Sequence, residues 1–141
     1  MMWIIDASVA VRWFLEDEAH ENADAVLRRL LEEPGRFAVP ELFAFEVYAV
    51  LNRLHPNGAW AFGKGVIPLL QGGLLRQPMT SDLASVADQF VEKGLTGYDA
   101  CYAALAIQLK GCWLTFDEKA HQKIAEEEVS CLLSDGMPPG W

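Results

Sequence analysis

The chain has 141 residues, which suits one domain, because a chain of this length removes roughly two thirds of its unfolded surface from water on folding. Hydrophobic residues make up 52% of the sequence and charged residues 22%, which excludes a disordered or fibrous protein. The net charge of −9 argues against simple binding to phosphate backbones. It leaves open a nuclease whose carboxylates hold cations that invert the local charge.

Cysteine usage and apolar runs indicate a cytoplasmic protein. The three cysteines are odd in number and contain no CxxC pair, so we expect reduced thiols. Met1–Ile5 is too short an apolar run for a signal peptide. No segment reaches the length of about 18 uncharged apolar residues that a membrane span requires, and the densest stretch, Leu42–Leu51, contains Glu46.

Short apolar runs alternate with helix-like stretches along the first half of the chain. This alternation predicts a parallel sheet covered by helices. Pro40 suits the first turn of a helix, and the cluster 55–58 ends that helix. The predicted elements of this half are a strand at 3–5, helices at 7–15 and 19–31, a strand at 37–39 and a long helix at 40–54.

The second half continues the alternation after a glycine-rich stretch at 59–77, where we predict a helix and a short strand. Its other predicted elements are helices at 81–93 and 98–110, a strand at 112–115, a helix at 118–128 and a strand at 129–133. No repeat or linker marks a second domain. We therefore predict one three-layer α/β/α sandwich with a short parallel sheet over residues 1–135, followed by a peripheral turn-rich tail at 136–141.

Two acids occupy the same place relative to the predicted strands. Asp6 follows the strand at 3–5, Asp117 follows the strand at 112–115, and each precedes a helix. Ligands of parallel α/β sheets gather beyond the carboxyl ends of the strands, so both carboxylates are candidates for one crevice. Asp is also a preferred helix N-cap, so a purely structural role is the competing interpretation for each.

Two further acids lie at the start of a predicted helix or inside one. Asp99 follows Thr96 by three residues, which matches a capping box and also places a carboxylate at the sheet edge. Glu46 is the only charged residue within Leu42–Leu51 and flanks the apolar face of its helix. An ionised carboxylate beside a core is costly unless a cation or hydrogen bonds compensate. Glu46 is therefore a candidate ligand, unless its side chain reaches the surface.

Together these four acids provide what a hard divalent cation needs, because Mg²⁺ and Mn²⁺ prefer oxygen ligands. A metal held by carboxylates can activate water and neutralise the charge that grows on a phosphate, which suits phosphodiester cleavage. Ser8 and Thr115, each two residues from one of the acids, are candidates to orient a carboxylate or a water. Both hydroxyls also suit ordinary capping or turn roles.

At these residues the sequence resembles the PIN-domain family, and within it the VapC-type toxins of toxin–antitoxin pairs. The resemblance rests on three stretches, IIDASVAVRWFL, VPELFAFEVYAVL and LTGYDACYAALAIQLKGCWLTFDEKA. The four acids fall in the family's order and in four different contexts, and the match covers nearly the whole chain.

The resemblance implies an endoribonuclease that depends on Mg²⁺ or Mn²⁺, with the four acids as its catalytic and metal-coordinating residues. It implies supporting roles for Ser8 and Thr115. It further implies a homodimer held inactive by an antitoxin protein that covers the apolar groove and the site. The glycine-rich stretch 59–77 departs from the family's pattern.

Two other signals concern phosphate binding. Residues 58–64 spell GxxxxGK, but Gly65 stands where a phosphate-binding loop needs Ser or Thr, so we predict no nucleotide site there. The basic residues form no run. Arg12, about one helical turn beyond Ser8, is the candidate for contacting substrate phosphate. A solvated helix residue is the competing interpretation.

Three functions remain compatible with the sequence. The first is the toxin ribonuclease of a toxin–antitoxin pair, and the second is a PIN nuclease of RNA processing without an antitoxin. The third is a catalytically silent PIN-fold binding module whose acids serve only as helix caps. A metal site present only in the folded state must raise the melting temperature when metal is added, whereas capping carboxylates leave it unchanged.

Overall fold

The computed structural model describes residues 1–141, and its sheet is built on strands of continuous apolar sequence. The three inner strands are β1 (Trp3–Ile5), β2 (Phe37–Pro40) and β4 (Cys112–Thr115), and nearly all of their residues are buried. Burial on both faces explains why these strands show no alternation of polar and apolar residues. The shorter strands β3 (Leu75–Gln77) and β5 (Ser130–Leu132) form the two edges.

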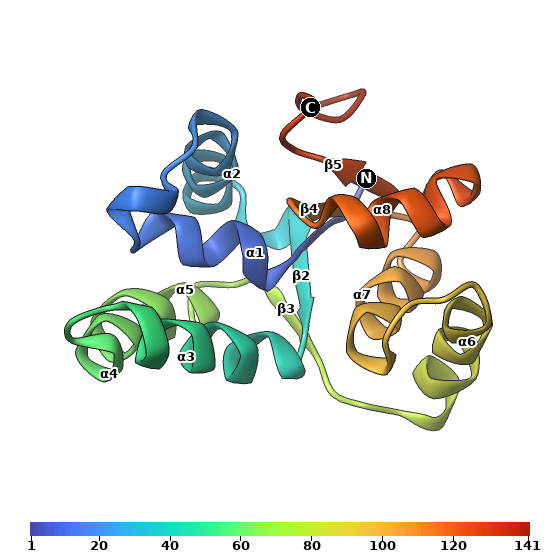
Figure 1. The fold of residues 1–141 in the computed structure, drawn as a ribbon, viewed down its shortest axis with the longest axis horizontal. Helices are drawn as coiled ribbons and strands as arrows, with labels where there is room; N and C mark the ends of the chain where they lie inside the picture. Colours follow the sequence, from blue (N-terminus) through green and yellow to red (C-terminus); the bar gives the residue numbers. More distant parts are fainter.

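All strands are parallel in the order β3-β2-β1-β4-β5, and helices cover both faces of the sheet. In the view of Figure 1, α1 to α5 lie to the left of the sheet and α6 to α8 to its right. The predicted three-layer sandwich is thus confirmed. The left-hand helices are α1 (Ala7–Ala10), α2 (Glu21–Glu32), α3 (Leu42–Leu54), α4 (Gly58–Ala61) and α5 (Ile67–Leu70); the right-hand helices are α6 (Ser81–Glu92), α7 (Gly97–Gln108) and α8 (Glu118–Ile124).

The strand order reverses between β1 and β4. The chain moves from β1 through β2 to β3 on one side, then crosses back to β4 and continues outward to β5. Neighbouring strands that send their helices to opposite faces leave a crevice beyond their carboxyl ends. This crevice follows Ile5 and Thr115, the last residues of the two strands.

The predicted helix at 7–15 is wrong in its second half. After α1 the chain tightens into the 3₁₀ turns η1 (Val11–Trp13) and η2 (Glu16–Glu18). The indole of Trp13 donates a 2.8 Å hydrogen bond to the carbonyl of Ala23 in α2, which turns the chain back early. Two further 3₁₀ turns are η3 (Pro34–Arg36), before β2, and η5 (Ala125–Glu127), after α8.

Pro40 ends β2 and does not lie in the first turn of α3, contrary to the prediction. It pairs with Gln77 of β3, and the backbone nitrogen of Glu41 donates 2.9 Å to the carbonyl of Gln77. This pairing holds the chain against β3 for one residue longer, so α3 begins only at Leu42.

The glycine-rich stretch is helical up to Leu70, with a π-helical segment, η4 (Phe62–Val66), between α4 and α5. A side chain at Gly58 would collide with the backbone of Leu51 and Asn52 in α3. A side chain at Gly65 would collide with the ring of Phe14. These glycines therefore serve close packing of helices and form no phosphate-binding loop.

The C-terminal tail folds back onto the amino ends of the central strands. The ring of Trp141 lies 5.3 Å from that of Trp3 and 6.2 Å from that of Phe37, measured between centroids. The guanidinium of Arg29 lies 4.8 Å from the Trp141 ring centroid. None of the helices combines the length and apolar character that crossing a bilayer requires.

Candidate functional site

The crevice between β1 and β4 contains a cavity of about 320 Å³ that all four predicted acids line. We call it the acid cavity. Asp6 enters it from the end of β1, Asp117 from the end of β4, Glu46 from α3 and Asp99 from the first turn of α7. Its remaining lining residues are Ala7, Ser8, Val11, Arg12, Leu15, Glu18, Val50 and Leu54.

Asp6 is nearly enclosed, with 7% of its surface exposed, and three donors hold its carboxylate. The indole nitrogen of Trp113 donates to Oδ1 at 3.2 Å. The hydroxyl of Thr115 and the backbone nitrogen of Ser8 each donate to Oδ2 at 3.1 Å. The bond from Ser8 is an N-cap of α1, so the capping interpretation and the cavity-lining interpretation are both realised in one side chain.

Glu46 is half-buried, and its partner is a tyrosine that the sequence analysis did not single out. The hydroxyl of Tyr102 donates to Oε1 of Glu46 at 2.7 Å. The Tyr102 ring stacks on Trp113, with centroids 5.7 Å apart and planes 12° apart. One stacked aromatic pair therefore orients two of the four acids, because Trp113 donates to Asp6.

Asp99 and Asp117 both lie at helix starts. The hydroxyl of Thr96 caps α7 by accepting from the backbone nitrogen of Asp99 at 3.1 Å, as the capping box predicts for that bond. Oδ1 of Asp117 caps α8 by accepting from Ala120 at 3.0 Å. A carboxylate has two oxygens, so capping with one leaves the other free to face the acid cavity.

The two predicted hydroxyls connect the ends of β1 and β4. Thr115 is fully buried; its hydroxyl donates to Asp6 and accepts from the backbone nitrogen of Asp117 at 3.0 Å. The hydroxyl of Ser8 accepts from the backbone nitrogen of Phe116 at 3.0 Å. Thr115 thus sets the relative positions of two acids, and Ser8 ties α1 to the loop after β4.

Comparison with known proteins shows the family to which this fold belongs. The pattern of the PIN domain family matches residues 3–127, which include all four acids. The chain belongs to the PIN domain family. A search of curated proteins found no match.

Solved structures share the fold of this PIN domain at low sequence identity. FitAcB from Neisseria gonorrhoeae is 18% identical with a TM-score of 0.67, and the alignment covers 88% of this chain and 94% of that one. PAE2754 from Pyrobaculum aerophilum is 23% identical with a TM-score of 0.63, covering 87% and 79%. VapC20 from Mycobacterium tuberculosis is 16% identical with a TM-score of 0.64, covering 85% and 93%.

Burial and the charges of neighbouring acids raise the pKa values of Asp6, Glu46 and Asp99. Burial, with a contribution from the charge of Asp99, raises the pKa of Asp6 to about 6. Burial, with contributions from Asp6 and Asp99, raises the pKa of Glu46 to about 7. Burial and the charge of Asp117 raise the pKa of Asp99. None of the four acids forms a salt bridge, and the charge of Lys123 only partly opposes the rise in the pKa of Asp99.

The chemistry of these side chains fits a hard divalent cation, which would supply the missing positive charge. In this conformation no group of three or more His, Cys, Asp or Glu side chains lies close enough together to hold an ion directly. Mg²⁺ keeps several of its waters and often binds through one or two carboxylates. The residues therefore fit a hydrated ion, with some acids bonded to its waters.

A larger cavity of about 590 Å³ lies at the opposite ends of the strands, lined among others by Trp3, Cys112 and Cys131. It contains none of the four acids, so the smaller acid cavity is the candidate functional site. The sequence analysis missed Tyr102 and Trp113 as orienting residues. No local spacing signals these roles, because Tyr102 is 56 residues from Glu46 in the sequence and Trp113 is 107 residues from Asp6.

Proposed function

We propose that this PIN domain is a metal-dependent endoribonuclease with Asp6, Glu46, Asp99 and Asp117 as its catalytic and metal-binding residues. The proposal rests on one observation, that four carboxylates line one cavity without a paired protein cation. Gathering four acids is unfavourable for stability, so a ligand that needs them is the physical reason to keep them together.

When bound, Mg²⁺ or Mn²⁺ would activate a water and neutralise charge on the scissile phosphate. The protein's own residues hold the acids still. Thr115 and Trp113 fix the carboxylate of Asp6, and Tyr102 fixes that of Glu46. Such orientation matters because a small misplacement of a catalytic group costs a large part of the rate.

Structural neighbours support a place in a toxin–antitoxin system. VapC20 is described as a Sarcin-Ricin loop cleaving toxin, and FitAB was solved bound to a DNA fragment. We propose that this chain is a cytoplasmic toxin, that RNA is its substrate, and that an antitoxin protein inhibits it.

Apolar surface is available for the proposed antitoxin and for a homodimer. Phe45 on α3 and Trp60 on α4 are 74% and 66% exposed. A groove of about 340 Å³ between α3, α6 and α7 is lined by Leu42, Leu83 and Tyr98 among others. Exposed apolar surface of this kind is typical of protein-binding sites.

The first test is cleavage of total cellular RNA by the purified protein, in Mn²⁺ or in EDTA. We expect cleavage only with metal, and we expect Asp99→Asn to lose at least about 100-fold in rate because it removes a charged ligand from the cavity. Asp88→Asn removes an exposed carboxylate on α6 and serves as the matched control. Equal activity of Asp99→Asn and Asp88→Asn would refute the assignment of the site.

A silent binding module is the second candidate, because Asp6 and Asp117 do cap helices. The change in melting temperature on addition of metal distinguishes the nuclease from the silent binding module. A metal bound only by the folded state must raise the melting temperature, whereas acids that serve only as caps leave it unchanged on addition of Mn²⁺. A nuclease of RNA processing would cleave RNA in the same way but would have no inhibitory partner.

A further inference from the structure

Arg12 is the only cationic side chain that lines the acid cavity. Five carboxylates share the cavity with it, those of Asp6, Glu18, Glu46, Asp99 and Asp117. When an RNA strand brings its phosphates to the acids, every charged residue of the cavity wall except Arg12 repels them. Arg12 is therefore the one residue of the cavity wall that attracts phosphate directly.

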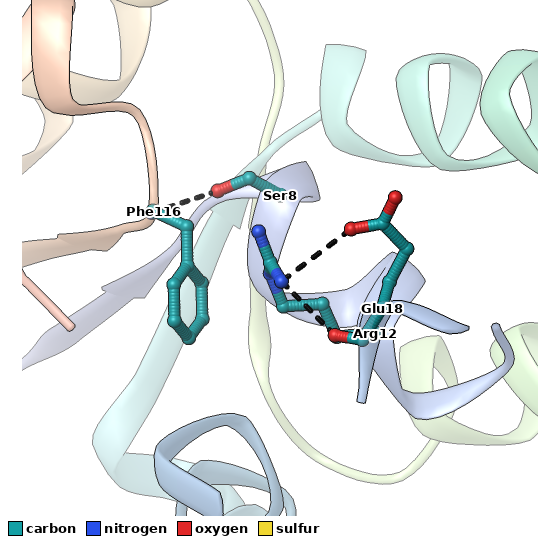
Figure 2. Close-up of polar contacts among 4 residues, drawn as sticks. All are labelled: Ser8, Arg12, Glu18 and Phe116. Carbon is teal, nitrogen blue, oxygen red and sulfur yellow. Dashed lines mark hydrogen bonds and ion pairs between the residues drawn. The ribbon is translucent and has the colours of Figure 1, made fainter. Parts of the chain in front are cut away.

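The guanidinium of Arg12 is held in a defined plane (Figure 2). Its Cζ lies 4.1 Å from the centroid of the Phe116 ring, and Nη1 donates to the backbone carbonyl of Glu18 at 3.0 Å. Ser8 fixes Phe116 in turn by accepting from its backbone nitrogen. The side chain of Arg12 is only 24% exposed. These contacts reduce the rotamer freedom that a bound phosphate would otherwise have to remove.

One edge of the guanidinium has no partner. Nε is shielded from solvent and makes no hydrogen bond, and Nη2 makes none either. Figure 2 shows the unbonded terminal nitrogen pointing away from Glu18. The shielded Nε is not reached from the cavity in this conformation, so the terminal nitrogen Nη2 is the donor from which a phosphate oxygen can accept.

The carboxylate of Glu18 also lies beside the guanidinium of Arg12 and therefore competes with a phosphate for it. Its oxygen lies 3.6 Å from Nη1 of Arg12, and the side chain of Glu18 is half exposed. An exposed ion pair at this distance contributes little to stability and is readily displaced. In the free protein the carboxylate of Glu18 can therefore partly neutralise the charge of Arg12, and a bound phosphate can displace this carboxylate.

We propose that Arg12 binds the RNA phosphate beside the scissile one, and that the carboxylate of Glu18 competes with this phosphate for Arg12. This inference rests on the proposed ribonuclease function. Phe116 and the backbone of Glu18 position the guanidinium, so a lysine cannot replace it. Arg12 and Glu18 together determine the affinity for RNA, whereas the four acids carry out the cleavage step.

The test measures binding of short random-sequence single-stranded RNA by fluorescence anisotropy in Mg²⁺, on an Asp99→Asn background that prevents cleavage. In that background, Arg12→Met keeps an unbranched apolar stem but removes the guanidinium, and with it the charge and the stacking on Phe116. We expect it to weaken binding about 10-fold and to lower the salt dependence by about 0.7 in log–log slope. Arg12→Lys should bind nearly as weakly, and Glu18→Gln should bind about 3-fold tighter.

Arg28→Met is the matched control, because it removes the same charge from an exposed position on α2 outside the cavity. Equal affinities for Arg12→Met and Arg28→Met, or weaker binding by Glu18→Gln, would overturn the inference. Melting temperatures of all variants identify a loss of folding. Absence of RNA cleavage by the unmutated protein in Mn²⁺ would instead refute the proposed function, so the two failures are distinguishable.

Discussion

At the scale of single residues, side-chain donors orient two of the four acids, Asp6 and Glu46. Tyr102 and Trp113 are aromatic residues of the core, yet each directs one polar atom at an acid of the cavity. Buried polar atoms of this kind need a partner, and the acids provide it. Core packing and the geometry of the candidate site are therefore coupled in the same two side chains.

Replacing Tyr102 with Phe tests this coupling, because Phe keeps the ring stacked on Trp113 and removes only the hydroxyl. We expect kcat for RNA cleavage to fall about 10-fold while the free energy of unfolding falls by only about 1 kcal/mol. The hydrogen bond lowers the pKa of Glu46, so its loss should also shift the pH–rate profile upward. A variant with unchanged kcat and unchanged pH profile would show that Tyr102 is only a core residue.

At the scale of elements, close contact between α3 and α4 decides where a glycine is required. The backbone of α3 approaches Gly58 so closely that no side chain fits there, whereas Gly63 faces open space. The two glycines of this stretch therefore differ in whether a side chain would fit at their position. Gly58 serves packing, and Gly63 has no neighbour that excludes a methyl group.

We expect Gly58→Ala to lower the free energy of unfolding by about 2 kcal/mol or more, because the new methyl group meets the backbone of Leu51 and Asn52. Gly63→Ala should be neutral or raise it by up to about 1 kcal/mol, because Ala restricts the unfolded chain and favours helix. Urea denaturation of the two variants checks this. Similar stabilities for both would contradict the close contact.

At the scale of the whole molecule, the acid cavity should make the metal-free protein sensitive to pH. The folded-state pKa of Asp6 is about 6 and that of Glu46 about 7, both above their ordinary values. A raised pKa means that the folded state binds protons more tightly than the unfolded state. Stability is therefore gained as pH falls toward the unfolded pKa values and lost as pH rises through the folded ones.

We expect the metal-free protein to melt at a higher temperature at about pH 5 than at about pH 7.5, from this contribution. Asp6→Asn should stabilise the metal-free protein at the higher pH by on the order of 1 to 3 kcal/mol, because it removes a buried charge. Calorimetry in EDTA measures both effects. Asp88→Asn, an exposed acid on α6, should change neither. A melting temperature that rises with pH over this range would contradict the raised pKa values.

The local pattern of the sequence was sufficient to predict the three-layer fold. Continuous apolar runs predicted the strands at 3–5 and 112–115 with the bounds that the structure shows. Apolar runs and helix breakers report on a residue's near neighbours, so they locate elements well. The pattern failed at Pro40 and after Ala10, where a contact with another element ends or delays a helix.

The sequence by itself also determined which four acids to consider, because each follows a predicted strand, begins a predicted helix or interrupts an apolar helix. Only the tertiary structure decided that they line one cavity, that Tyr102 and Trp113 orient two of them, and that Arg12 lies between Phe116 and Glu18. Strand order and helix placement bring these residues together from distant parts of the chain. Local periodicity does not encode that order, because it depends on which packing of all elements buries the most apolar surface at once.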